Sequence, residues 1–140
     1  MFKLTSLNLN GIRSATTKGV EAWIAATAPD CICVQELKAQ QTDIAGRFET
    51  LAELPGWFHC AEKKGYSGVG IYSRHAPSDV IVGFGNPEFD AQGRYIEARF
   101  DTPQRKRPII SSYSPSPLSG EDRQAAKYRF LVHMHACLMG

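Results

Sequence analysis

Two oxygen-bearing side chains stand at the ends of apolar segments of the sequence. Glu36 directly follows the run CICVQ at residues 31–35, and Asn8 lies at the end of the strand-like segment 1–9. Carboxylate and amide oxygens are the ligands that Mg²⁺ prefers, and the ion takes only one or two protein carboxylates while it keeps several waters. If the two segments are neighbouring strands, both side chains meet at one rim of a sheet, where they could hold such an ion.

The same residues also have a purely structural interpretation. Asn8 can cap the turn that Asn10 and Gly11 predict, because Asn side chains often hydrogen-bond the backbone two residues further on. Glu36 can pair with Lys38, which follows it closely in the sequence. The residue pattern alone favours this structural interpretation, and both interpretations remain open at this point.

The elements around these residues form a strand, a helix and a second strand. Residues 18–28 have apolar side chains at helical spacing, and Pro29 ends the helix before the strand at 31–35. A βαβ unit of this kind has parallel strands joined by a right-handed crossover. The ends of the strands at 1–9 and 31–35 are therefore expected to lie side by side.

The rest of the chain is expected to contain a second helix, a series of short strands and a final helix. Residues 42–54 have helical spacing and end at a Pro-Gly pair. The short strands alternate with turn residues, and loops this short favour antiparallel pairing. The expected strands cover residues 57–61, 69–73, 80–84, 94–100 and 108–113, and the final helix covers residues 121–138.

The composition indicates one globular domain. The chain has 140 residues, of which 43% are hydrophobic and 21% charged, with a net charge of +2. No run of eighteen apolar residues predicts a membrane span, and no apolar leader opens the sequence. The four cysteines contain no CxxC pair, which favours buried thiols in a reducing compartment. These features predict a cytoplasmic protein with no membrane partner.

One face of the expected sheet has no cover in the sequence. The helices over 18–28, 42–54 and 121–138 can cover one face of a mixed sheet, and the other face must pack against something. No second run of strands follows the last helix. We therefore expect residues 1–140 to form a single, C-terminally truncated domain that needs a missing C-terminal half, or self-association, to cover the sheet.

Six blocks of the sequence together resemble a known protein family more specifically than any single motif does. The blocks are LNLNGIRS (7–14), DCICVQELKA (30–39), KKGYSGVGIYSR (63–74), FDAQGRYIEARF (89–100), SSYSPS (111–116) and KYRF (127–130). In this order they resemble the exonuclease III family of AP endonucleases, within the endonuclease/exonuclease/phosphatase superfamily. One Asn-x-Asn-Gly motif would be weak support, whereas six ordered blocks across nearly the whole chain are specific.

The resemblance implies a fold, an activity and a cofactor. The implied fold is a four-layered α/β sandwich of two mixed sheets with helices outside, of which this chain is one mixed-sheet half. The implied activity is a Mg²⁺-dependent DNA phosphodiesterase of base-excision repair, with Mn²⁺ as an alternative ion. Its implied partner is double-stranded DNA with abasic sites or 3′ ends.

The resemblance also assigns roles to individual residues. Asn8 and Glu36 match the metal positions, and Tyr113 matches the active-site tyrosine, for which a packed aromatic is the structural alternative. Tyr66 matches a position that contacts DNA in the family, and its structural alternative is an ordinary aromatic residue in a hairpin. DNA contacts of this type ignore base sequence, so binding should weaken steeply with salt. The implied supporting residues are Asn10, Lys38, Asp90 and Arg94, and the implied DNA-binding residues are Arg13, Lys64 and Tyr66.

The sequence departs from the family in two places. The Asp-x-Asn and Ser-Asp-His blocks of the family's second half do not occur in the chain. Beyond Tyr113 the chain has Pro117 where the family usually has glycine. Since proline cannot adopt the positive φ that glycine allows, the loop that presents Tyr113 is expected to be displaced.

Three functional hypotheses follow. The first is an exonuclease III-like nuclease, and the second is a truncated, non-catalytic fragment that retains part of the DNA-binding surface and of the metal site. A phosphoesterase for inositol phosphates or lipids is disfavoured, because the Gly-Tyr-Ser-Gly-Val-Gly and Gly-Ile-Arg-Ser motifs belong to the nuclease branch. For residues 1–140 acting alone we expect little or no turnover, because two catalytic blocks are missing.

Overall fold

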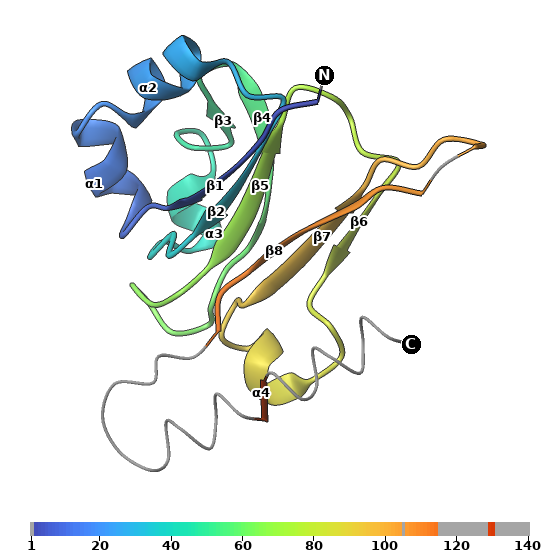
Figure 1. Ribbon diagram of the computed structural model, residues 1–140. Coiled ribbons are helices and arrows are strands. Elements are labelled where there is room, and N and C mark those ends of the chain that lie inside the picture. The colour runs from blue at the N-terminus through green and yellow to red at the C-terminus, as the bar shows by residue number, and fades with distance from the viewer. Residues whose placement is uncertain (1, 105, 115–128, 131–140) are drawn as a thin grey trace.

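The structure of the chain is a computed structural model that describes residues 2–104, 106–114 and 129–130 (Figure 1). The helices are α1 (Ile12–Thr17), α2 (Val20–Thr27), α3 (Gln41–Ile44) and α4 (Pro87–Asp90). The strands are β1 (Leu4–Asn8), β2 (Cys31–Gln35), β3 (Thr50–Leu51), β4 (Leu54–His59), β5 (Val69–Ser73), β6 (Asp79–Val82), β7 (Tyr95–Arg99) and β8 (Pro108–Ser112). They form a five-stranded sheet, β1-β2-β5-β4-β3, and a three-stranded sheet, β6-β7-β8.

The first strand–helix–strand unit is present as predicted. Strands β1 and β2 pair in parallel, with Leu4 opposite Cys31 and Asn8 opposite Gln35. The crossover contains α1 and α2 rather than one helix, and Gly19, between them, has a φ of 92° that a helix interior does not allow. The carboxyl ends of β1 and β2 therefore meet at one rim of the sheet.

The helix predicted over residues 42–54 is wrong for most of its length. Helix α3 ends at Ile44, and β3 and β4 form a hairpin instead. Ala52 and Glu53 connect these strands with φ values of 49° and 70°. Two successive residues with positive φ make a tight hairpin turn that matches the twist of the strands. The pairing of β3 with β4 thus outweighs the helical spacing of the apolar residues.

The expectation that one sheet face lacks cover is also corrected. The short strands do not all join one sheet, because β6, β7 and β8 pair with one another and pack on the first sheet (Figure 1). A buried cluster joins Cys33 and Ile71 of the first sheet to Ile96 and Ala98 of the second. The inner face of β2, β4 and β5 is therefore covered by the chain's own second sheet.

The central strands β2 and β5 are buried on both faces, as the continuous apolar run of β2 indicates. Side chains alternate along a strand, so Ile32 and Val34 pack toward the helices while Cys31 and Cys33 pack toward the second sheet. Both cysteines are free thiols that are at most 5% exposed. This confirms their expected role as small buried side chains.

Most of the predicted C-terminal helix lies outside the described residues. Of the helix predicted over residues 121–138, only Arg129 and Phe130 are described, and Phe130 packs against Phe84 and Phe89. The edge strand β1 carries Leu4, whose side chain is 52% exposed. Within the described residues, no helix has the length and hydropathy needed to cross a membrane.

Candidate metal and phosphate site at the ends of β1 and β2

The structure brings Asn8 and Glu36 together, as their places in the sequence predict. The Asn8 Nδ2 amide donates a hydrogen bond of 3.0 Å to Glu36 Oε1. The backbone pairing continues beyond the strands, since Leu9 N–H donates to the Gln35 carbonyl and Gly11 N–H donates to the Glu36 carbonyl, at 2.9 and 2.8 Å. The site is therefore placed by main-chain bonds rather than by a free loop.

Three residues of the site have left-handed backbone conformations. Asn10, Glu36 and Lys38 have φ values of 48°, 53° and 50°. Such conformations are uncommon for residues other than glycine, and they persist only where the surroundings hold them. On the side facing β5, Lys38 N–H donates to the Ser67 carbonyl at 2.9 Å and Leu37 N–H donates to the carbonyl of the next residue, Gly68. The loop after β2 is thus held from both sides.

The Glu36 side chain is ionised in this setting. The hydrogen bond from Asn8 lowers the pKa of Glu36, with smaller contributions in the same direction from Tyr113 and Lys38 and a partly opposing effect of burial. Its side chain remains 20% exposed. Glu36 is therefore negatively charged at neutral pH and reachable from solvent.

Lys38 and Asn10 complete the rim. Lys38 Nζ donates to Asn10 Oδ1 at 2.7 Å and lies 3.6 Å from Glu36 Oε2. The Asn10 N–H donates to Asn8 Oδ1 at 3.0 Å. The contacts of the structural interpretation, in which Asn8 caps the turn and Glu36 pairs with Lys38, are thus present. They do not exclude a metal role, because the same oxygens lie together at the rim.

Tyr113 approaches the carboxylate from the second sheet, one residue after β8. Its hydroxyl lies close enough to the Glu36 carboxylate to interact with it, and the Arg94 guanidinium carbon lies 5.4 Å from the centroid of the Tyr113 ring. Burial raises the pKa of Tyr113, and the Glu36 carboxylate raises it further. The phenol is therefore protonated at neutral pH and is a hydrogen-bond donor.

The other predicted residues divide into two groups. Tyr66 joins the site through Arg94, whose Nη2 donates to the Tyr66 hydroxyl at 2.6 Å. Arg13 lies on α1, where its guanidinium forms an ion pair of 2.7 Å with Asp43, and the positive charge of Lys64 also acts on Asp43. Arg13 and Lys64 thus belong to a neighbouring exposed surface around one carboxylate.

Asp90 does not reach this group of side chains. Its carboxylate accepts hydrogen bonds from the backbone N–H groups of Phe84 and Gly85, at 3.0 and 3.1 Å. It therefore holds the loop between β6 and α4. The supporting role implied for Asp90 is not matched by any contact with the site among the described residues.

Two residues near the site were not found from the sequence. Gln35 Nε2 donates to Ser111 Oγ at 3.2 Å and so connects the two sheets directly behind Glu36. The sequence signal that could have identified Gln35 is a polar residue at the end of an apolar strand. Asp43 pairs with Arg13, and it had no local signal because the two residues lie on different elements.

The donors at the rim fit a hard divalent cation that keeps most of its waters. One carboxylate and two amide side chains are present, from Glu36, Asn8 and Asn10. Among the described residues, no group of three or more His, Cys, Asp or Glu side chains could form a closed metal cage. This set suits Mg²⁺ or Mn²⁺ and does not suit a structural zinc site.

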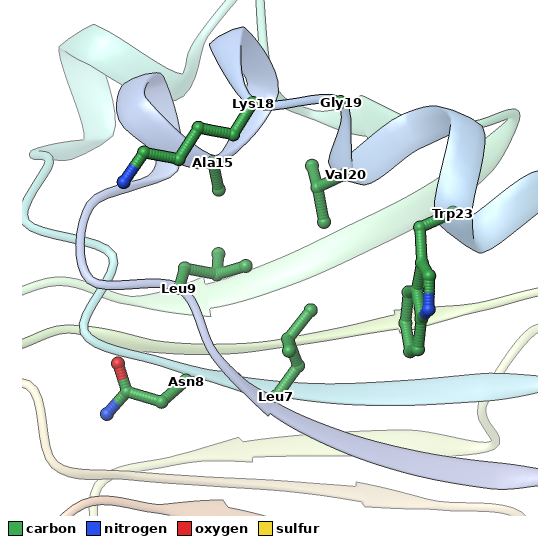
Figure 2. Close-up of a pocket in the computed structure, with 8 residues that line it drawn as sticks. All are labelled: Leu7, Asn8, Leu9, Ala15, Lys18, Gly19, Val20 and Trp23. Carbon is green, nitrogen blue, oxygen red and sulfur yellow. The ribbon is translucent and has the colours of Figure 1, made fainter.

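A pocket of about 400 Å³ borders the other side of β1. Figure 2 shows Leu7, Leu9, Val20 and Trp23 around the space under α1 and α2, with Asn8 at its margin. Its lining is mostly apolar, and the Glu36 carboxylate is not part of it. Of the three rim residues, the pocket therefore shares only Asn8.

Replacing Asn8 with aspartate is expected to make the stability of the folded chain depend on a cation bound at the rim. A second carboxylate would face Glu36, and two unit charges about 4 Å apart repel by about 1 kcal/mol even in water. In EDTA the variant should unfold at a lower denaturant concentration than wild type. Mg²⁺ or Mn²⁺ should restore its stability, because the ion binds the two carboxylates in the folded state.

The matched control for this substitution is Asn86→Asp. Asn86 caps α4 by accepting a hydrogen bond from Glu88 N–H, and aspartate caps equally well. This control should show no cation-dependent stability. Equal stability of the Asn8→Asp variant and wild type in EDTA, with no response to either ion, would contradict a cation site at this rim.

Comparison with known proteins supports these observations. Residues 5–136 match the Endonuclease/Exonuclease/phosphatase family. The chain is 30% identical over 140 residues to the DNA repair nuclease APEX1 of Danio rerio, which covers 99% of this chain and 44% of that protein. It is 32% identical over 122 residues to the Exodeoxyribonuclease of Bacillus subtilis, which covers 86% of this chain and 46% of that protein.

A solved structure shows the same fold. The AP endonuclease LMAP from Leishmania major superposes with a TM-score of 0.82 at 23% identity, over 98% of this chain and 47% of that one. This likeness confirms the expected α/β fold. The chain spans about half the length of the relatives that it matches.

Proposed function

Because the chain belongs to the endonuclease/exonuclease/phosphatase family, we propose that it forms the metal- and phosphate-binding half of a DNA phosphodiesterase of the exonuclease III type. The single observation that carries the proposal is the convergence of Asn8, Glu36 and Tyr113 at the rim of the two sheets. The proposed substrate is double-stranded DNA with abasic sites or 3′ ends. The proposed location is the cytoplasm, with which the free thiols of Cys31 and Cys33 are compatible.

Each residue at the rim has a definite task in this proposal. Glu36 and Asn8 would hold Mg²⁺ or Mn²⁺, which when bound supplies positive charge for the scissile phosphate and the leaving 3′ oxygen. Asn8 orients the carboxylate by its hydrogen bond, and Lys38 adds a positive charge beside it. Tyr113 keeps its proton and, once a phosphate is bound, would donate it in a hydrogen bond to a phosphate oxygen, where negative charge develops, in place of the Glu36 carboxylate.

The surface next to the rim would bind the DNA backbone. Arg13 is 51% exposed despite its ion pair with Asp43, and Lys64 lies in the exposed loop that also carries Tyr66. Positive side chains on phosphates give affinity without base readout, because the counterions released are the same for every sequence. Binding to duplex DNA should therefore weaken as salt is raised.

A non-catalytic DNA-binding role is the second candidate. Glu36 is the only carboxylate that the described residues place at the rim, and they show no histidine beside it. A nuclease also needs a group that orients or activates the attacking water. If no further segment supplies that group, the chain would bind the cation and DNA but not cleave.

One assay tests both candidates together. The chain is incubated with a duplex that carries a single abasic site, in Mg²⁺ and in EDTA, and both binding and cleavage are measured. Binding with little or no cleavage is expected for residues 1–140 alone. Robust cleavage that EDTA abolishes would show that the chain is a complete nuclease, and absence of any duplex binding would contradict both candidates.

A further inference from the structure

Arg94 is a buried positive charge without an acidic partner in the described part of the chain. Its side chain is 2% exposed, and the ion pairs formed by the described residues do not include it. Burial of a charge is costly unless hydrogen bonds compensate it. The groups that do so here should therefore indicate what Arg94 is for.

The partners of the Arg94 guanidinium are mainly two tyrosines from different parts of the chain. Nη2 donates to the Tyr66 hydroxyl at 2.6 Å, and Nη1 donates to the Tyr113 carbonyl at 3.0 Å. The guanidinium carbon lies 5.5 Å from the centroid of the Tyr66 ring and 5.4 Å from that of Tyr113. The remaining nitrogen, Nε, donates to Gln92 Oε1. The planar fork of arginine thus joins two rings that would otherwise be independent.

The main chain strengthens the connection to Tyr113. Tyr113 N–H donates to the Arg94 carbonyl at 3.0 Å, while Arg94 Nη1 bonds the Tyr113 carbonyl. Arg94 therefore holds the Tyr113 peptide on both sides of its Cα. This leaves the Tyr113 hydroxyl to reach Glu36 from the second sheet.

The contact also orients the hydroxyl of Tyr66. Its oxygen accepts a hydrogen bond from a cation, so its own proton must be donated to another acceptor. A hydroxyl that accepts from a charged donor becomes a stronger donor itself, because hydrogen bonds in a chain polarise one another. The Lys63 ammonium, 5.3 Å from the ring centroid, adds positive charge beside the same side chain.

We propose that Arg94 is a positioning residue that couples the DNA-contacting Tyr66 to the active-site Tyr113. This inference rests on the proposed function, since it assumes that a phosphate meets both side chains. Arg94 itself is too buried to touch the DNA. When the Tyr66 hydroxyl donates to the backbone of a duplex, the guanidinium fixes the Tyr113 main chain in the position from which its hydroxyl faces the scissile phosphate.

The first test is a double-mutant cycle on the affinity for an abasic-site duplex, measured in EDTA so that no cleavage occurs. Tyr66→Phe removes the hydroxyl, and Arg94→Lys keeps the charge but loses the fork. Each should weaken binding by about 5- to 10-fold, and the double variant should be no more than about twofold weaker than either, because both remove the same unit. Effects that multiply in the double variant would overturn the coupling.

The control for the cycle is Arg99→Lys. Arg99 is the last residue of β7, the strand that Arg94 immediately precedes, and it pairs with Glu97 and Asp101, at 2.9 and 3.8 Å, away from both tyrosines. Its substitution should change the affinity by less than about twofold. An effect as large as that of Arg94→Lys would show that strand β7 acts on binding without specific coupling, and would count against the proposal.

The second test does not depend on activity. The chain is labelled with 3-fluorotyrosine, and fluorine resonances are assigned with Tyr66→Phe and Tyr113→Phe. Addition of the duplex should shift the resonances of both Tyr66 and Tyr113 in wild type, and the Tyr113 shift should be clearly smaller in Arg94→Lys, where the Tyr113 main chain is no longer held. The buried Tyr72, whose hydroxyl bonds the Phe48 carbonyl, should not shift and so reports an intact fold.

The outcomes of the second test separate the two proposals. A Tyr113 shift of the same size in Arg94→Lys as in wild type, or one that is missing in wild type when Tyr66 shifts, would overturn the coupling and leave the proposed function intact. If the duplex does not bind at all, the proposed function fails. In that case the chain without DNA provides the test of the positioning role. Arg94→Lys is still expected to shift the fluorine resonances of both tyrosines and to narrow the Tyr66 resonance. Unchanged resonances would overturn the positioning role.

Discussion

Replacing Glu36 with glutamine is expected to abolish the response of the chain to divalent cations. Glu36 is the one carboxylate that the described residues place at the rim, so the variant keeps the shape of the site but loses its charge. A cation present at 100 times its dissociation constant stabilises a folded protein by about 2.7 kcal/mol. Denaturant unfolding of wild type with Mn²⁺ and with EDTA should show a difference of this order, and the variant should show none.

Cleavage by an assembled or complete nuclease should fall with the same substitution. A metal ion contributes several kcal/mol to the stabilisation of transition-state charge, which corresponds to a loss of at least about 100-fold in rate. The backbone conformation at residue 36 does not distinguish the two side chains, so the fold should be retained. The exposed Glu62→Gln is a matched control that should alter neither measurement. Normal cation response in Glu36→Gln would remove this residue from the metal site.

Replacing Tyr113 with phenylalanine is expected to reduce cleavage while leaving the structure in place. The ring keeps its contact with Arg94, and the main-chain bonds to Arg94 do not involve the hydroxyl. Removal of one well-placed donor to a developing negative charge typically reduces the rate by about 10²–10³-fold. Single-turnover cleavage of an abasic-site duplex in Mg²⁺ by an assembled or complete nuclease measures this loss, with duplex affinity in EDTA expected to change little.

Tyr72→Phe provides the matched control for the loss of a phenol. The Tyr72 hydroxyl bonds the Phe48 carbonyl in the core beneath the helices. Its removal should lower the free energy of unfolding by about 1 kcal/mol without changing the cleavage rate. If Tyr113→Phe cleaves within about threefold of wild type, the hydroxyl has no direct part in the reaction, and Tyr113 is a packed aromatic as the structural alternative holds.

The parts of the fold that were predictable depend on local rules. The parallel pairing of β1 and β2 followed from a strand, a helix and a strand in sequence, because such crossovers have one favoured geometry. The helix over residues 42–54 failed because apolar spacing does not report a competing hairpin. Ala52 and Glu53 carry no glycine or asparagine signal for the positive φ values that they adopt.

The separation into two sheets was likewise not visible in the strand pattern. Each short strand has the same alternating texture whichever sheet it joins, and the sequence contains no signal for the point at which pairing stops. In the structure, β5 ends at Ser73 and β6 begins at Asp79 in the other sheet. The sheet face expected to be open is thereby covered by residues of the same chain, Ile96 and Ala98 among them.

The sequence by itself determined the chemistry available at the site. The side-chain types and their positions at strand ends place an amide and a carboxylate at one rim, because neighbouring parallel strands end together. The six ordered blocks also determined the family, which the match over residues 5–136 confirms.

The tertiary structure alone decided which groups surround that carboxylate. Arg94 reaches Tyr66 and Tyr113 from a third segment of the chain, and Arg13 pairs with Asp43 from another element. Such contacts join residues that are far apart in sequence, and they form only when the elements that carry them pack together. No local pattern encodes them, because their free energy depends on the burial and geometry that packing creates.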